Sequence, residues 1–85
     1  MKWGLAIANR ARHAMRDMPR ADAAQIDSAF LEMRADPYAG DVRFLKGTDR
    51  VLRRRVGDWR IMYEVRADLG VIVVNDVERR SSNTY

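Results

Sequence analysis

Basic side chains are concentrated in one short segment of this chain, and nearly all of them are arginines. Residues 43–60 contain seven basic residues and two acidic ones, a net charge of +5. Residues 1–42 are neutral overall and residues 61–85 carry −1, so this segment accounts for the net charge of +4. Concentrated positive charge indicates a polyanionic partner, and arginine suits phosphate because its guanidinium group can form two parallel hydrogen bonds. The alternative is a solvated basic strand that binds nothing.

Three arginines of this segment are spaced so that they can act on one phosphate group. Arg53 and Arg55 are two residues apart, so they project from the same face of an extended strand. Gly57 and Asp58 are a two-residue turn signal, which brings Arg60 onto the neighbouring strand. The spacing therefore predicts a cluster of guanidinium groups that clamps a phosphate.

Such a clamp requires a sheet, and the second half of the chain has the pattern of one. Runs rich in β-branched and aromatic residues alternate with turn residues, which predicts strands at residues 42–46, 51–56, 59–66 and 71–77. The tight turns between them make these strands pair antiparallel. Trp59, Ile61 and Tyr63 share the face that we expect to be buried. Arg60 then lies on the opposite, open face.

The first half of the chain predicts a short strand and two helices. We expect a strand at residues 3–7, a helix at residues 10–18, and a second helix from Asp22 or Arg20 to about Ala35. Asn9 is a candidate cap for the first helix, and Pro19 separates the two. The predicted fold class is α+β: a short N-terminal strand, a helical hairpin, then a four-stranded antiparallel meander with the helices on one face of the sheet. We expect residues 1–85 to form a single domain, because domains usually have roughly 100–150 residues.

Arg54 conflicts with the alternation expected for its strand. It shares a side with Leu52 and Val56, which we expect to be buried. Either its side chain snorkels past the edge of the sheet, or a bulge shifts the register. The sequence leaves both explanations open.

Several classes of site are excluded by composition. The chain has no cysteine, which excludes a disulfide scaffold, a thiolate metal site and a cysteine nucleophile. Its one histidine, His13, is interpreted as an exposed surface residue. A single histidine without cysteine, and without carboxylates at ligand spacing, predicts no metal site, and we expect no cofactor. No apolar run approaches the roughly 20 residues that span a membrane, and residues 1–10 do not resemble a secretory signal. We therefore expect a cytoplasmic protein without a membrane partner.

The basic segment and its surroundings form one continuous pattern. It consists of Leu45-Lys46-Gly47, the basic strand, Gly57-Asp58-Trp59-Arg60-Ile61-Met62-Tyr63, and a final Val77-Glu78-Arg79-Arg80 with Tyr85. This pattern resembles the signature of the RelE/ParE superfamily of bacterial toxins, and of its RelE branch in particular. The order of strand, two helices and four strands matches too. The resemblance thus covers essentially the whole chain.

The resemblance implies a toxin of a type II toxin–antitoxin system. In the RelE branch such toxins are ribosome-dependent endoribonucleases that cut messenger RNA and inhibit translation, whereas members of the ParE branch poison DNA gyrase. The resemblance also implies a cognate antitoxin as partner. We expect that antitoxin to lay an acidic or amphipathic segment over the basic face or the helical hairpin.

The resemblance assigns roles to individual positions. The catalytic residues would be Arg60, Arg79 and Tyr85, and RNA or phosphate would be bound by Lys46, Arg53, Arg55 and Arg80. Two positions depart from many relatives. Glu78 stands where they have histidine, and a carboxylate there would repel phosphate. Tyr85 lies further from the arginines than their tyrosine does.

The expected chemistry is cleavage of RNA by its own 2′-hydroxyl group. Arginines can position the phosphate and stabilise the charge that develops on it. They cannot accept the proton, because a guanidinium group stays protonated. Tyr85, the arrangement of the substrate or the ribosome itself would have to do so, which fits a toxin that depends on the ribosome.

Three functions follow as hypotheses. The first is a metal-independent endoribonuclease that acts on messenger RNA and the ribosome. The second is a gyrase inhibitor of the ParE type, which binds without catalysis. The third is a non-toxic basic binding module with the same fold. The fold does not separate them, but the strand arginines and the terminal tyrosine favour the first.

Overall fold

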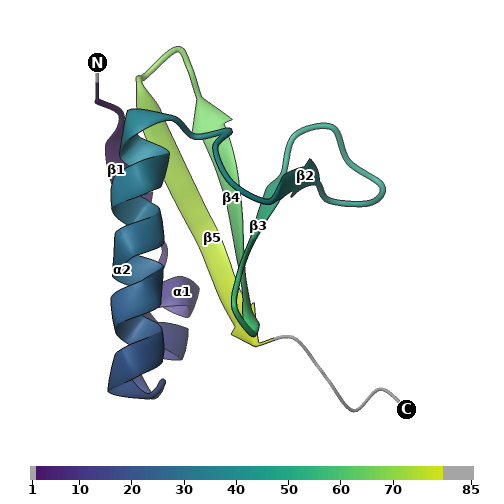
Figure 1. The fold of residues 1–85 in the computed structure, drawn as a ribbon. Helices are drawn as coiled ribbons and strands as arrows, with labels where there is room; N and C mark the ends of the chain where they lie inside the picture. Colours follow the sequence, from purple (N-terminus) through teal and green to yellow (C-terminus); the bar gives the residue numbers. More distant parts are fainter. Residues whose placement is uncertain (1, 80–85) are drawn as a thin grey trace.

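The computed structural model describes residues 2–79 as an α+β fold (Figure 1). In chain order the elements are β1 (Gly4–Ile7), α1 (Asn9–Arg16), α2 (Arg20–Ala35), β2 (Val42–Phe44), β3 (Leu52–Val56), β4 (Trp59–Arg66) and β5 (Val71–Arg79). The predicted order of one strand, two helices and four strands is confirmed. Within residues 2–79, neither the length nor the hydropathy of any helix is sufficient to cross a membrane.

All five strands form one mixed sheet, in the order β1-β5-β4-β3-β2. The neighbours β2–β3, β3–β4 and β4–β5 are antiparallel, so the predicted meander is confirmed. The N-terminal strand adds a fifth member, because β1 pairs parallel with β5 from Gly4 opposite Val71 to Ile7 opposite Val74. The helical hairpin makes this possible, since a parallel pair needs a long connection between its strands.

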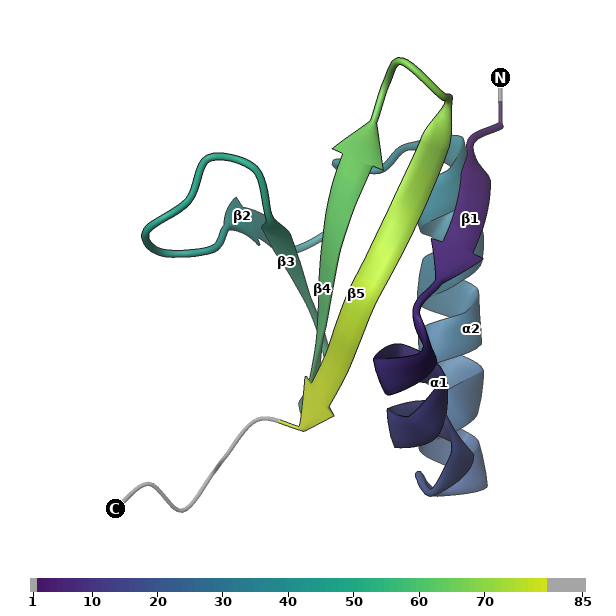
Figure 2. The ribbon, with the colours of Figure 1, turned by 180° about the vertical axis from the view of Figure 1, so that it is seen from behind.

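Both helices lie on one face of the sheet, as predicted (Figure 1 and Figure 2). The apolar stripe of α2 packs onto the buried side chains of the two longest strands. The core thus consists chiefly of Ile26, Ala29, Phe30 and Met33 from α2, Ile61 and Tyr63 from β4, and Ile72, Val74 and Val77 from β5. Among the described residues, no helix covers the other face of the sheet.

The ends of α1 differ from the prediction. Ala8, whose backbone is extended at φ −67° and ψ 156°, occupies the N-cap position, and Asn9 is already helical. No side chain caps the helix, so the assignment of Asn9 as a cap was wrong. The helix ends at Arg16 rather than at residue 18, because the residue before Pro19 is sterically disfavoured in the helical conformation.

A bulge interrupts β5 and sets the direction of its last side chains. Tyr63 lies opposite Val74 but Met62 lies opposite Asp76, so Asn75 is an extra residue in β5. Val74 and Val77 are three residues apart and both are buried, whereas strict alternation would place them on opposite faces. The bulge therefore turns Glu78 to the open face and Arg79 to the face of the helices.

Candidate functional site

Four charged side chains form a row across the open face of the sheet. Arg55 of β3 lies directly opposite Arg60 of β4, and Arg60 lies opposite Glu78 of β5. Asp41, just before β2, lies beyond Arg55, whose backbone N–H donates a hydrogen bond of 3.1 Å to the Asp41 carbonyl. We call Asp41, Arg55, Arg60 and Glu78, in this order, the charged row.

An ion pair closes each end of the charged row. Arg60 Nη2 is 3.4 Å from Glu78 Oε1, and Arg55 Nε is 3.9 Å from Asp41 Oδ2. The side chains of Arg60 and Arg55 are 37% and 40% exposed, which leaves both guanidinium groups accessible to a ligand. Half-exposed pairs of this kind contribute little to stability.

The centre of the charged row keeps two positive charges side by side. Like charges directly opposite each other destabilise a pair of strands. In addition, Arg60 Nε is buried and has no hydrogen-bond acceptor among residues 2–79. An oxyanion bound between Arg55 and Arg60 would relieve the repulsion and could satisfy this donor. The row thus has the electrostatics of an anion site.

A second line of side chains adds positive charge beside the charged row, in which two carboxylates balance the two arginines. Arg43 of β2 lies opposite Arg53 of β3, which in turn lies opposite Met62 and, beyond it, Asp76. Asp76 Oδ2 is 3.1 Å from Arg10 Nε of α1, so that carboxylate is already paired. Two further arginines are therefore present on the open face.

The structure brings Arg53, Arg55 and Arg60 onto one face, as their spacing predicts. Arg43 joins them, although it is not among the predicted site residues. The pairing of β2 with β3 could have indicated Arg43, because residues that lie directly opposite each other on paired strands share one face of the sheet.

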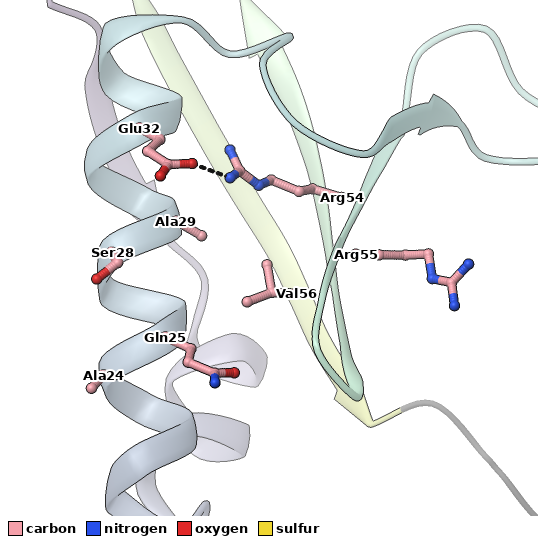
Figure 3. Close-up of a pocket in the computed structure, with 8 residues that line it drawn as sticks. All are labelled: Ala24, Gln25, Ser28, Ala29, Glu32, Arg54, Arg55 and Val56. Carbon is pink, nitrogen blue, oxygen red and sulfur yellow. Dashed lines mark hydrogen bonds and ion pairs between the residues drawn. The ribbon is translucent and has the colours of Figure 1, made fainter.

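Arg54 points the other way, toward α2 (Figure 3). It is 7% exposed, its Nη2 pairs with Glu32 Oε1, and its Nη1 donates to the carbonyl of Ala39 at 3.2 Å. The β3–β4 register is regular, so no bulge is involved. Gly40, at φ 87°, leaves room for the guanidinium group, since a Cβ there would lie 2.9 Å from Arg54 Cζ. Arg54 therefore fastens β3 to α2 and does not belong to the open face.

A groove of about 380 Å³ lies between α2 and β3 (Figure 3). Its lining residues are Ala24, Gln25, Ser28, Ala29, Glu32, Arg54, Arg55 and Val56. Most are small or uncharged, and the side chain of Arg55 points away from α2. The groove thus shares only Arg55 with the charged row and lies on the helix side of β3.

Arg79 does not join the charged row. It lies opposite Trp59 on the helix side, with its guanidinium carbon 5.6 Å from the centre of the Trp59 ring. Trp59 is itself buried, as we expected for a core residue, and its Nε1 donates to Asp22 Oδ2 of α2 at 3.0 Å. The structure therefore separates Arg60 from Arg79, two residues for which the resemblance implies a shared catalytic role.

Tyr63, the tyrosine of the signature, is part of the buried core. Tyr63 is fully buried, and its hydroxyl group donates to the carbonyl of Pro37 at 2.5 Å. Burial raises the pKa of Tyr63 to about 12; Arg54 acts in the opposite direction, and Tyr38 and Asp36 add to the increase. Tyr63 therefore links β4 to the segment after α2.

The remaining predicted residues lie apart from the charged row or outside the described part. Lys46 is exposed in the loop between β2 and β3, and His13 is exposed on α1. Arg80 and Tyr85 lie outside the described residues. Among residues 2–79, no three acidic or histidine side chains are grouped as metal ligands would be.

Comparison with known proteins gives consistent matches. The family model described as "ParE toxin of type II toxin-antitoxin system, parDE" matches residues 6–84. Toxin RelE1 of Methanocaldococcus jannaschii is 28% identical over 83 residues, which cover 94% of this chain and 92% of that protein.

Solved structures share the fold. A chain of the archaeal RelE–RelB complex from Pyrococcus horikoshii has a TM-score of 0.84 at 24% identity, with 96% of this chain and 99% of that chain covered. The isolated RelE toxin of Escherichia coli has a TM-score of 0.82 at 18% identity, with 96% and 88% covered. The matched region of the family model includes every strand that carries the charged row. The chain therefore belongs to the family of ParE toxins of type II toxin–antitoxin systems, within the RelE/ParE superfamily whose signature it resembles.

Proposed function

We propose that this toxin is a metal-independent endoribonuclease that cleaves messenger RNA on the ribosome. The observation that carries the proposal is the central pair of the charged row, Arg55 and Arg60, which lie opposite each other and are both partly exposed. Adjacent strands are about 4.8 Å apart, so the two guanidinium groups can each bind a non-bridging oxygen of one phosphate.

In the proposed reaction, the ribose 2′-oxygen attacks the adjacent phosphorus and the bond from phosphorus to the 5′-oxygen breaks. The products are a 2′,3′-cyclic phosphate and a 5′-hydroxyl end. Arg55 and Arg60 stabilise the negative charge that develops on the phosphate oxygens. Arg43 and Arg53, in the neighbouring line, bind phosphates on either side of the scissile bond.

The ribosome has a defined role in this proposal. Self-cleavage requires the 2′-oxygen, the phosphorus and the 5′-oxygen to be in line, and orienting them supplies much of the rate. The charged row lies on an accessible strand face, and its half-exposed arginines bind phosphate without fixing the sugar. The ribosome would hold the messenger RNA in the reactive conformation, so the toxin would act in the cytoplasm.

A cognate antitoxin is part of the proposal. Structures similar in fold are described as RelE–RelB toxin–antitoxin complexes. For this chain we propose that an antitoxin covers the charged row with acidic side chains, or lays an amphipathic segment along the helical hairpin. Either mode would stop RNA from reaching Arg55 and Arg60.

Expression of the full chain in growing bacteria tests the proposed function. We expect growth to stop and messenger RNA to be cut within coding regions. Arg60→Ala should abolish both effects. Arg66→Ala is the matched control, because Arg66 is also in β4, at its other end, where its Nη2 is 3.5 Å from Asp68. Equal toxicity of the Arg60→Ala and Arg66→Ala variants, with messenger RNA still cut, would contradict the proposal.

A second candidate is inhibition of DNA gyrase, favoured by the ParE description of the matching family. The pairing of Arg60 with Glu78 also favours it, since the carboxylate offsets the positive charge that an RNA phosphate would meet. This function predicts a DNA-damage response with messenger RNA intact. The same expression experiment thus separates the two candidates.

A further inference from the structure

We propose that Glu78 is the base that accepts the proton of the attacking 2′-hydroxyl group. This inference rests on the proposed function, because it assigns a step of the same RNA cleavage. The arginines of the charged row can stabilise charge but cannot accept a proton. Glu78 is the carboxylate that contacts Arg60, at 3.4 Å, and it belongs to the same row.

The strand register gives Glu78 the required position. It lies directly opposite Arg60 on the neighbouring strand, about 4.8 Å away along the row. A phosphate held by Arg55 and Arg60 is bonded through its 3′-oxygen to the ribose that carries the attacking 2′-hydroxyl group. This ribose can therefore lie over β5. The Glu78 side chain is 43% exposed, so its carboxylate can reach a ligand bound on this face.

The bulge at Asn75 keeps Glu78 in this position, because it accommodates one extra residue of β5 without shifting the pairs that follow. Strict alternation from buried Val74 would turn residue 78 toward the helices. The extra residue reverses the faces, so that Glu78 joins the charged row while Arg79 packs on Trp59. Asn75 also donates a hydrogen bond of 3.0 Å to Glu64, which fixes the bulge on β4.

The proposed step balances as follows. The Glu78 carboxylate takes the proton from the 2′-hydroxyl group as the bond from the 2′-oxygen to phosphorus forms. The bond from phosphorus to the 5′-oxygen breaks, and the 5′-oxygen takes a proton from water. Glu78 then gives its proton to the resulting hydroxide, which restores the carboxylate.

A counter-ion role for Glu78 predicts the opposite result. If Glu78 only neutralises Arg60, its removal frees a guanidinium group, and both RNA affinity and cleavage rate rise. Asp41 provides the matched comparison, because it pairs with Arg55 at the other end of the row in the same way. The direction of the rate change therefore separates a base from a counter-ion.

The test is single-turnover cleavage of a 5′-labelled messenger RNA held in purified ribosomes, with toxin in excess. We expect Glu78→Gln to lower the maximal rate by about 100-fold or more, while the toxin concentration at half-maximal rate does not increase. Asp41→Asn should bind more tightly and cleave at least as fast as the unchanged protein. Glu78→His should restore cleavage and move the acidic limb of the pH–rate profile to higher pH, because imidazole has a higher pKa than a carboxyl group.

Two results would overturn the inference, and they differ. If the unchanged protein cuts the messenger RNA and Glu78→Gln cuts it equally fast or faster, Glu78 is not the base, although the proposed function stands. If the unchanged protein cuts no ribosome-bound messenger RNA, the proposed function and this inference both fail. Thermal unfolding of each variant checks that the half-exposed Arg60–Glu78 pair can be broken without unfolding the chain.

Discussion

At the scale of single residues, neighbouring arginines of β3 have different roles because their side chains leave opposite faces of the strand. Arg53 and Arg55 lie on the open face, whereas Arg54 is buried against α2. The same division holds in the signature of the next strand. Arg60 belongs to the charged row, while Trp59 and Tyr63 form hydrogen bonds that hold the helix side together. Much of the signature is therefore structural.

Replacement of adjacent arginines should separate these two roles. Arg54→Ala removes a buried side chain with an ion pair to Glu32 and a hydrogen bond to Ala39, so we expect a loss of about 2 kcal/mol in the free energy of unfolding. Arg55→Ala, in an exposed position, should cost no more than about 0.5 kcal/mol. Urea unfolding measures both. Equal losses would contradict the assignment of Arg54 to the structure and Arg55 to the surface.

Stability in alkaline solution should depend on Tyr63. Burial raises its pKa to about 12 from the ordinary value of 10.0, so the folded chain holds the phenol proton more tightly than the unfolded chain. This contribution is complete below pH 10 and is lost as the pH rises from 10 to 12, because the unfolded chain releases the proton first.

Tyr63→Phe removes this titration. The variant should be less stable at neutral pH by about 1 kcal/mol, since the carbonyl of Pro37 loses its donor. Its free energy of unfolding should then fall less steeply between pH 10 and 12 than that of the unchanged protein. Urea unfolding at each pH measures this difference. If the free energies of unfolding of the two proteins fell equally between pH 10 and 12, Tyr63 would not be the group that titrates.

At the scale of elements, the β3–β4 hairpin was predictable because its pairing is regular and local. Alternation alone placed Arg53, Arg55 and Arg60 on one face. Non-local features were not predictable. The partner of Arg54 lies on α2, 22 residues away in sequence, and the parallel pairing of β1 with β5 joins the two ends of the fold.

The faces on which Glu78 and Arg79 lie follow from the bulge at Asn75, which no local sequence pattern predicts. Strict alternation along β5 fails at Asn75, and every side chain after it changes face. A family signature assigns roles to residues by their order in the sequence, so it does not show which face of the strand each residue occupies. Arg79 was therefore grouped with Arg60, although the two side chains lie on opposite sides of the sheet.

A deletion and an insertion at the bulge test its effect. Deletion of Asn75 gives a regular strand with Glu78 still opposite Arg60, so the variant should fold with a loss of about 1 kcal/mol or less and keep its activity. An alanine inserted after Asn75 should turn Glu78 and the buried Val77 to the wrong faces and destabilise the chain by about 2 kcal/mol or more. Urea unfolding of both variants checks this, and an insertion variant as stable as the deletion variant would contradict the described register.

At the scale of the whole molecule, the arginines of the basic segment are divided between the two faces of the sheet. Arg43, Arg53, Arg55 and Arg60 are on the open face, where strands present them at regular intervals. Arg54 and Arg79 lie on the helix side, paired with a carboxylate and an aromatic ring. Only some of the arginines of the basic segment therefore lie on the open face, and the strand register fixes their positions there.

Binding of single-stranded RNA to this surface should depend on salt. Each phosphate contact contributes about −0.7 to the slope of log K against log salt concentration, so three or four arginines predict a slope of about −2 to −3. Arg53→Ala should make the slope less steep by about 0.7, and Arg66→Ala should leave it unchanged. Fluorescence anisotropy with a labelled RNA measures these slopes. A slope near zero would rule out the open face as an RNA surface.

The most direct test of the charged row as an RNA-cleaving site is an end-group analysis of messenger RNA after incubation with purified ribosomes and toxin. We predict that the unchanged protein produces fragments with a 2′,3′-cyclic phosphate and a 5′-hydroxyl end. Arg60→Ala should yield at least about 100-fold less of these fragments, and Arg66→Ala the same amount as the unchanged protein. Intact messenger RNA with the unchanged protein, or equal cleavage by the Arg60→Ala variant, would contradict this function.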